Sequence, residues 1–389
     1  MISSSPLLWD GLALLDDERA LRAGVGDRRA SFELTVAEMP PHTGFLVAAG
    51  VEEALAALAQ HHLTEPAVQQ AQRIVGFGDA LARRLTGAAP SVDLDAVSEG
   101  TPVFAGAPVA TVDGPLLEAL LACALVAPAL RRGMTIATRA ARLHIAAGGA
   151  LLIDAASVRA SSEREALAIA RAAHVGGAAA TTSALAAAAL GVPFRGEPLL
   201  DLGPLSPPDT RHDEGWGPPD RLVPLGGGDE EALLIEALRL DARASGWLAS
   251  GLADAPGVQI PLRCELVALE QDGAWVPRRG AADRADVLPG RKMVARYLDD
   301  AARAVADVVH LSHERMRSPR SLGAARLQPL ARAVMRAGRA LESPESPRAG
   351  RERSIAGRQQ LPPAVTHLRA PARYRVDLSP GVIALRDAD

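Results

Sequence analysis

The chain has 389 residues, enough for a sizeable core and two or three domains. Its formal charge of -4 and pI near 6.2 give no electrostatic basis for binding nucleic acid or an anionic membrane. The first 20 residues lack a basic leader followed by an apolar core, and no uncharged apolar stretch of about 20 residues occurs, so we expect a cytoplasmic protein without nucleic-acid or membrane partners.

The first part of the chain mixes strands with a helix. Residues 31–37 and 43–49 have strand character, and residues 51–63 carry apolar side chains at helical spacing. Residues 102–112 alternate small and apolar side chains around a glycine, which is typical of two short strands separated by a turn. Mixed α and β structure is therefore expected from the start.

From residue 113 onward, helices and strands alternate. We expect helices over 116–130, 135–147, 162–174 and 181–190, and strands over 150–154 and 192–194. The third of these helices opens at Ser162, with Glu165 in the capping-box position. Such alternation indicates parallel strands joined by helical crossovers.

The second half of the chain begins with a loop. Residues 203–220 are rich in Pro, Gly and Asp and predict a surface segment. We expect a hairpin around Asp272 and Gly273. The other expected elements are strands over 221–225, 291–297 and 374–378, helices over 229–245 and 321–341, and a charged loop over 343–361.

Three short patterns could indicate ligand sites. The glycines 226–228 stand between a strand and a helix, where backbone N–H groups could hold a phosphate, but the acidic residues 229–231 favour an ordinary turn. His310 and His313 have i, i+3 spacing beside Glu314, but no third ligand follows, so helix-surface residues are the favoured interpretation and no metal is expected. The weaker histidine candidates are His42, His61 and His62.

The two cysteines and three of the arginines are also candidates for a structural or ligand-binding role. Cys123 and Cys264 lie far apart in apolar runs, so we expect small buried hydrophobes and no disulfide framework. Arg139, Arg142 and Arg159 stand where a helix or strand end could present a guanidinium to a phosphate or carboxylate. Taken singly, a surface or ion-paired position is the favoured interpretation of each arginine.

Several blocks follow one another in a recognisable order. They are SFELTVAEMPPHTGFLVAAGVEEAL, EGTPVFAGAPVATVDGPLLEALL, TIATRAARLHIAAGG, ALAIARAAHVGGAAATTSALAAAALGVPFRG, LPGRKMVARY, SLGAAR and ARYRVDLSP. In this order and spacing, which covers most of the chain, the sequence resembles the nicotinate phosphoribosyltransferase family.

The resemblance implies an α/β fold: an irregular α/β barrel plus a mixed α/β domain formed by N-terminal and C-terminal segments. On this basis we expect the mixed domain at 1–112, the barrel at 113–300, and a packing segment at 301–389. The barrel is shortened between 205 and 263 and could be incomplete. A homodimer with active sites near the subunit interface is also implied.

The implied reaction belongs to NAD salvage. Family members join nicotinate, a pyridine carboxylate, to phosphoribosyl pyrophosphate with Mg²⁺ present, and ATP hydrolysis through a phosphohistidine drives the reaction. Such a site needs an aromatic ring, several arginines and a histidine. The substrate-binding residues implied here are Arg139, Arg142, Arg159, Ser183 and Gly196.

The motifs that carry this chemistry are altered. The family's Phe-Gly-x-Arg-Arg falls on residues 155–159, which keep one arginine and no ring, and the phosphohistidine position is Leu200, so no catalytic residue is assigned. The Asp-Leu-Tyr motif falls on residues 10–12 without its aromatic, and the family's acidic barrel-strand motifs are not evident. We therefore expect weakened or lost native activity; the alternative is an inert homologue with a structural or regulatory role that pairs with another subunit.

Overall fold

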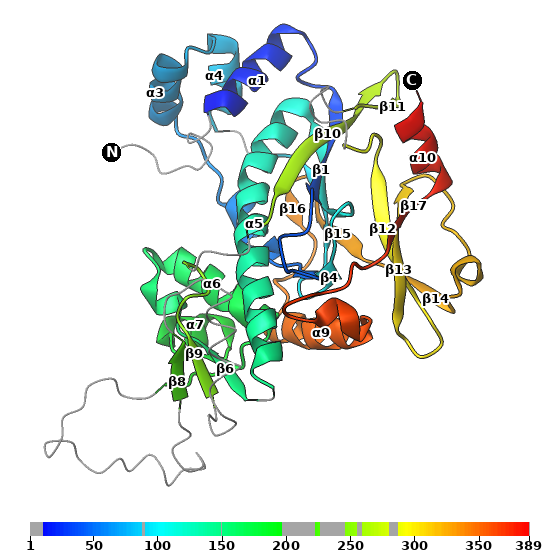
Figure 1. Ribbon diagram of the computed structural model, residues 1–389. Helices are drawn as coiled ribbons and strands as arrows, with labels where there is room; N and C mark the ends of the chain where they lie inside the picture. Colours follow the sequence, from blue (N-terminus) through cyan, green and yellow to red (C-terminus); the bar gives the residue numbers. More distant parts are fainter. Residues whose placement is uncertain are drawn as a thin grey trace, which may run out of the picture.

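One long helix, α5 (Leu116–Ala146), joins a large antiparallel sheet to a smaller parallel sheet in the computed structural model (Figure 1). The structure describes residues 11–87, 90–148, 150–196, 222–225, 246–254, 259–279 and 287–388. The expected mixed α/β fold is confirmed. The helix predicted over 229–245 and the glycines 226–228 lie outside the described residues.

The large sheet has seven antiparallel strands drawn from three parts of the chain. Their order is β11 (Ala274–Pro277), β10 (Leu262–Gln271), β1 (Arg29–Val36), β5 (Pro108–Pro115), β3 (Asp93–Val97), β15 (Ala331–Arg336) and β16 (Arg339–Ala340). Side chains alternate between the two faces of a strand. On β1, Phe32 and Leu34 therefore join the hydrophobic core with α5, whereas Ser31 and Glu33 face the other way.

The parallel sheet contains β7 (Ala180–Thr181), β6 (Leu151–Asp154), β9 (Gly246–Ala249) and β8 (Leu222–Leu225), in that order. Helices α6 (Glu163–Gly176) and α7 (Ala184–Leu190) supply the crossovers around β7. Ser162 caps α6 by accepting from the Glu165 amide, as its capping-box position predicts. Alternating helices and parallel strands are thus confirmed for this part of the chain.

A third sheet and two helices complete the C-terminal part. The sheet contains β14 (Arg326–Pro329), β12 (Lys292–Leu298), β13 (Ala304–Leu311) and β17 (Val376–Leu378), and the helices are α9 (Pro347–Gln360), beside α6, and α10 (Pro380–Asp387). The helix predicted over 321–341 is wrong, because β14, β15 and β16 occupy this range. Pro329 interrupts a helical run, and pairing with β12 and β3 overrides the local helix propensity.

The remaining described elements belong to the N-terminal part. They are α1 (Gly11–Arg22), β2 (Leu46–Val47), α2 (Val51–Ala59), α3 (Glu65–Val75), α4 (Asp79–Leu85) and β4 (Pro102–Val103). The two strands expected over 102–112 exist, but β4 pairs with β2 and β5 pairs with β1 and β3. The hairpin at Asp272 and Gly273 is confirmed, since both have positive φ between β10 and β11.

Helix α5 is continuous, so the prediction of two helices over 116–147 is wrong. Gly133 lies between the two predicted helices. A Cβ there would lie 2.6 Å from the Gly50 amide nitrogen, so glycine is required for close packing. Among the described helices, α5 alone is long and apolar enough to cross a membrane, but most of it is buried in the protein core and it carries four arginines.

Replacing Gly133→Ala is expected to lower the free energy of unfolding by about 2 kcal/mol, because the methyl group would press on backbone atoms that cannot move freely. Urea denaturation measures this loss. Gly11→Ala is the matched control, since its nearest neighbour would be Val75 Cγ2 at an ordinary 3.5 Å. Equal stability of the two variants would contradict the packing explanation.

Asp17 on α1 is a buried carboxylate, and neither of its oxygens has a hydrogen-bond partner. Burial, with a smaller contribution from the charge of Asp16, raises the pKa of Asp17 to about 8. An unfolded Asp has a pKa of about 3.9. Between these values the folded chain binds more protons, so stability should fall as pH rises from about 4 to about 8.

Asp17→Asn is therefore expected to stabilise the protein by about 1–3 kcal/mol at pH 8 and by much less at pH 5. Urea unfolding at the two pH values measures the difference. Asp16→Asn is the control, because Asp16 is exposed on the same helix. A pH-independent effect of the Asp17 variant would show that its carboxyl does not hold the proton.

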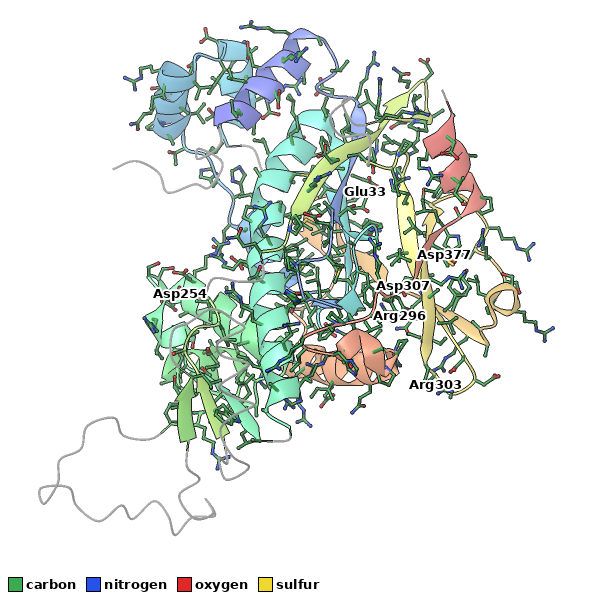
Figure 2. The ribbon with its side chains drawn as sticks, viewed as in Figure 1. Glu33, Asp254, Arg296, Arg303, Asp307 and Asp377 are labelled. Carbon is green, nitrogen blue, oxygen red and sulfur yellow. The ribbon has the colours of Figure 1, made fainter. Side chains whose placement is uncertain are left out.

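A buried cluster ties the third sheet to the N-terminal part (Figure 2). Arg296 donates from Nε and Nη2 to the two carboxylate oxygens of Asp307, each at 2.8 Å, and also donates to the Pro102 carbonyl. Tyr374 donates to Asp307 and stacks on Phe104, with ring centroids 4.0 Å apart. Two of the chain's few aromatic rings are thus used in the core.

Candidate functional site

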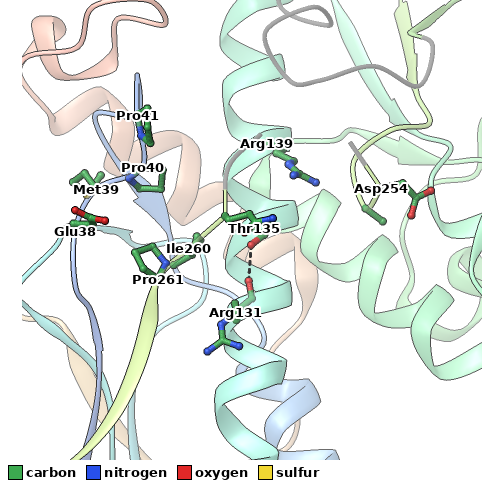
Figure 3. Close-up of a pocket in the computed structure, with 12 residues that line it drawn as sticks. Glu38, Met39, Pro40, Pro41, Arg131, Thr135, Arg139, Asp254, Ile260 and Pro261 are labelled. Atoms are coloured by element: carbon green, nitrogen blue, oxygen red, sulfur yellow. Dashed lines mark hydrogen bonds between the residues drawn. The ribbon is translucent and has the colours of Figure 1, made fainter. Parts of the chain in front are cut away.

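A cavity of about 900 Å³ opens beside α5 (Figure 3). Its walls come from α5, from the loop after β1 and from residues 253–254 and 259–261. The lining residues are Glu38, Met39, Pro40, Pro41, Arg131, Thr135, Arg139, Ala253, Asp254, Gln259, Ile260 and Pro261. None of these residues is aromatic.

Helix α5 contributes Arg131, Thr135 and Arg139 at four-residue spacing, which places them on one face. Arg131 Nη2 donates to the Leu262 carbonyl at 2.9 Å, and Arg139 Nη1 donates to the Leu252 carbonyl at 2.9 Å. Thr135 donates to the Arg131 carbonyl (Figure 3). These bonds to backbone carbonyls hold two guanidiniums along the wall of the cavity.

The other walls are mixed in character. Glu38 and Asp254 present exposed carboxylates, and Met39, Pro40 and Ile260 supply apolar surface. Such a cavity can bind an anion through the guanidiniums, and its carboxylates are the hard oxygen ligands that Mg²⁺ accepts when phosphates complete its coordination. In the part of the chain that the structure describes, no group of three His, Cys, Asp or Glu side chains could hold a metal by itself.

The cavity lies next to the C-terminal ends of the parallel strands. Asp254 follows β9, and the Ala155 amide after β6 donates to the Ala249 carbonyl at 3.1 Å. In α/β folds with parallel strands this edge is the usual position of ligand sites. Arg131, Thr135, Glu38 and Asp254 were not predicted as site residues. Glu38 and Thr135 lie in the family-like blocks but match no catalytic motif, and Arg131 and Asp254 lie outside those blocks.

Asp154, at the end of β6, organises this edge. Its Oδ1 accepts from the amides of Ala156 and Ser157 at 2.9 and 3.2 Å. Its Oδ2 accepts from the hydroxyls of Ser157 and Thr181, at 2.5 and 2.8 Å. The carboxylate thus fixes the turn after β6 to the end of β7.

The turn held by Asp154 includes a 3-10 helix over Ser157–Arg159. Val158 is 58% exposed, and the Arg159 side chain is also exposed. Set against the family's Phe-Gly-x-Arg-Arg, Val158 and Arg159 stand at the arginine pair and Ala155 stands at the ring. The turn itself therefore offers one guanidinium and no aromatic ring. The altered motif therefore stands at the expected strand end with few of the expected chemical groups.

The other implied site residues have different positions. Arg142 is buried and donates to the carbonyls of His42 and Leu368, at 2.8 and 3.1 Å, so it joins two loops. Ser183 caps α7 by accepting from the Ala186 amide. A Cβ on Gly196 would have its nearest neighbour at 3.7 Å, so packing does not require glycine there. Leu200 lies outside the described residues.

Phe194 is an aromatic residue that the sequence analysis did not consider for the site. It forms a parallel bridge with Thr181 beside β7, and its side chain is 51% exposed. It does not line the cavity. Its position next to a strand end in a parallel sheet was the signal that could have identified it.

The helix expected to carry His310 and His313 is not observed. His310 lies in β13 rather than on a helix, is fully buried, and has Nε2 3.4 Å from the Tyr297 hydroxyl. Glu314 accepts from the Ser379 hydroxyl and from the Gly381 amide at the start of α10. The strand conformation separates side chains that helical spacing would have brought together, so His310, His313 and Glu314 do not form the expected helical face.

The other histidines and the two cysteines named in the sequence analysis do not line the cavity. His61 is buried, which lowers its pKa, and His42 lies in a loop with its Nδ1 3.2 Å from the Arg369 carbonyl. Both cysteines are free thiols; Cys123 is buried in the main core and Cys264 packs against that core.

Several known proteins similar to this chain are nicotinate phosphoribosyltransferases. The model of the nicotinate phosphoribosyltransferase C-terminal domain matches residues 291–386. Nicotinate phosphoribosyltransferase pncB1 of Mycobacterium tuberculosis is 35% identical over 190 residues, which cover 49% of this chain and 42% of that protein. The Bacillus subtilis nicotinate phosphoribosyltransferase is 30% identical over 175 residues, 45% of this chain and 36% of the relative. The matches thus span less than half the length of these relatives.

Two crystal structures extend the likeness in fold. Human nicotinic acid phosphoribosyltransferase has a TM-score of 0.74 at 20% identity, covering 97% of this chain and 98% of that chain. Nicotinate-nucleotide pyrophosphorylase from Pyrococcus furiosus has a TM-score of 0.66 at 17% identity, covering 92% and 97%. The chain is thus similar in sequence to nicotinate phosphoribosyltransferases over about half of its length, and it shares their fold over nearly all of it.

Proposed function

We propose that the chain is a nicotinate phosphoribosyltransferase-like protein of NAD salvage that retains anion binding but has weakened native catalysis. The observation that carries this proposal is the pair of guanidiniums, Arg131 and Arg139, along one wall of a cavity of about 900 Å³ at the C-terminal edge of the parallel sheet. The proposed ligand is phosphoribosyl pyrophosphate, because two fixed guanidiniums suit its phosphates.

Two features support weakened rather than full activity. The turn after β6 has no ring to stack on the pyridine, and it has one arginine where the family has two. Each loss would cost on the order of 2–3 kcal/mol, or about 10² in rate or affinity. Met39, Pro40 and Ile260 provide an apolar wall for the ring, which gives dispersion contacts without the geometry of aromatic stacking.

Of the two cofactors implied by the family, Mg²⁺ suits the residues of this chain and ATP does not. Mg²⁺ would be held by the phosphates of the ligand together with Glu38 or Asp254, whose carboxylates line the cavity, and it would offset the negative charge of the diphosphate. ATP coupling needs a phosphorylated histidine, and the corresponding residue is Leu200. We therefore derive no ATP-dependent step.

Calorimetric titration of phosphoribosyl pyrophosphate with Mg²⁺ tests the proposal, followed by assays of pyrophosphate release with nicotinate, nicotinamide and quinolinate. Saturable binding that weakens by about 10² in Arg139→Met, and also in the exposed Arg131→Met, would support it. Arg348→Met on α9 is the control, because this exposed arginine pairs with Glu352 outside the cavity. Absence of binding heat would overturn the proposal.

A catalytically inert homologue with a structural or regulatory role is the second candidate. The specific observation in its favour is that Val158, Leu185 and Phe194 expose apolar side chains just beyond strand ends in the parallel sheet. Such side chains suit contact with another subunit. Binding of phosphoribosyl pyrophosphate without turnover of any base would favour this function, whereas turnover would exclude it.

A homodimer and a cytoplasmic location remain part of the proposal. Both agree with the family and with a fold shared with soluble enzymes. Light scattering coupled to gel filtration tests the dimer, and variants Val158→Ser and Phe194→Ser show whether the exposed edge contributes to it. A monomer at micromolar concentrations would contradict this part of the proposal.

A further inference from the structure

A second pocket, of about 350 Å³, opens on the face of the large sheet that points away from α5. We call it the sheet pocket. Unlike the cavity beside α5, it is almost entirely polar. It is lined by Arg29, Asp93, Asp95, Thr111, Asp113, Glu270, Trp275, Arg291 and Arg336.

The strand register explains why these polar groups meet. Asp113 on β5 lies opposite Ser31 on β1 and opposite Asp93 on β3. One row further along, Thr111 lies opposite Asp95. Residues directly opposite each other lie on the same face of the sheet. On this face β1, β5 and β3 therefore carry neighbouring polar side chains, whereas a sheet covered on both faces would carry apolar ones.

The charges of the sheet pocket do not balance. Four lining residues are carboxylates and three are guanidiniums, which leaves an excess of one negative charge. Arg291 is bound to Asp113, with Nη2 2.5 Å from Oδ2, and lies over the Trp275 ring at 4.6 Å. The guanidinium of Arg29 is 3.6 Å from Asp93 and 3.8 Å from Glu270, too far to complete a hydrogen bond to either.

Buried atoms without hydrogen-bond partners collect at the same place. Asp113 is only 6% exposed, yet its Oδ1 has no donor. The hydroxyl of Ser31, which is fully buried opposite Asp113, also lacks a partner, whereas Asp95 Oδ1 is paired with Arg336 Nη2 at 2.6 Å. Buried polar atoms are normally satisfied, so these oxygens indicate a ligand that brings N–H donors.

We propose that the sheet pocket binds a small organic cation with a primary ammonium or guanidinium group. The excess carboxylate and the unsatisfied Oδ1 of Asp113 favour a positive donor over an anion. A bare metal ion fits less well, because within the described ranges no three potential ligands are close enough to hold one. The volume equals that of about a dozen water molecules, which accommodates a short diamine or agmatine.

Calorimetry with agmatine and with putrescine tests the inference on the full chain, with Mg²⁺ and inorganic phosphate as competing probes. We expect saturable binding of an amine that weakens about tenfold or more in Asp113→Asn and in Glu270→Gln. Glu270 is the safer variant, since it is partly exposed and has only a loose ion pair. Glu342→Gln is the control, because Glu342 pairs with Arg332 outside the sheet pocket.

Fluorescence of Trp275, isolated by comparison with Trp275→Phe, gives a second measurement. A change on adding agmatine that is absent in Trp275→Phe would place the ligand in the sheet pocket. No binding at millimolar amine, binding unaffected by the Glu270 variant, or preference for phosphate would each overturn the proposal. None of these outcomes depends on activity at the cavity beside α5.

Discussion

Restoring the family's groups in the double variant Ala155→Phe, Val158→Arg is expected to raise pyrophosphate release with nicotinate by about 10² or more. The ring and the second guanidinium would each return on the order of 2–3 kcal/mol of binding or transition-state stabilisation. The position of the turn makes the test feasible, because Asp154 already holds residues 156 and 157 in place. Val158 is 58% exposed, so an arginine there displaces no core packing.

Initial rates with nicotinate, phosphoribosyl pyrophosphate and Mg²⁺ measure the gain. Val158→Arg alone should tighten phosphoribosyl pyrophosphate binding, whereas Ala155→Phe should act mainly through the base. Ile74→Arg is the matched control: it also replaces an exposed apolar residue with a guanidinium, but on α3. If the control changes binding as much as Val158→Arg does, the effect is one of net charge and the assigned turn is not the substrate site.

The sequence predicted the parallel part of the fold well because its signals are local. The capping box at Ser162 and the alternation of helices with short apolar strands do not depend on distant contacts. The helix expected over 321–341 is wrong because Pro329 interrupts the helical run and the conformation on either side of it is set by pairing with β12 and β3. The close packing of Gly133 against Gly50 within the continuous helix α5 likewise cannot be predicted from a local pattern.

The candidate site was predictable only where a family motif marks it. Arg139 lies on the cavity wall, but Arg142, three residues later on the same helix, points to the carbonyls of His42 and Leu368. No sequence pattern distinguishes the two arginines. Arg131 and Asp254 reach the cavity from segments with no motif, so their role follows from tertiary packing alone.

Replacing Lys292 is also expected to have a large effect, in this case on stability. Lys292 is the only lysine of the chain and is buried against Glu33. Lys292 Nζ lies 2.9 Å from Glu33 Oε2 and donates to the carbonyls of Leu288 and Gly290, and the Lys292 amide donates to Glu33 Oε1. The two side chains are 3% and 2% exposed. Burial raises the pKa of Glu33 and lowers that of Lys292, and the charge of each partner opposes these shifts.

Lys292→Met is therefore expected to cost about 3–5 kcal/mol of unfolding free energy at neutral pH, because it leaves a buried carboxylate without its cation. The loss should shrink as pH falls, since the raised pKa of Glu33 lets the folded chain take up a proton that the unfolded chain binds less tightly. Urea unfolding at several pH values measures both effects.

The double variant Glu33→Gln, Lys292→Met separates the charge from the packing. This double variant should recover much of the lost unfolding free energy, because neither side chain is charged. The glutamine side-chain oxygen at position 33 can still accept from the backbone amide of residue 292. Arg348→Met, which breaks an exposed ion pair on α9, should change stability by less than about 0.5 kcal/mol. If the double variant is no more stable than Lys292→Met, the cost comes from lost packing around β12 and not from an unpaired Glu33.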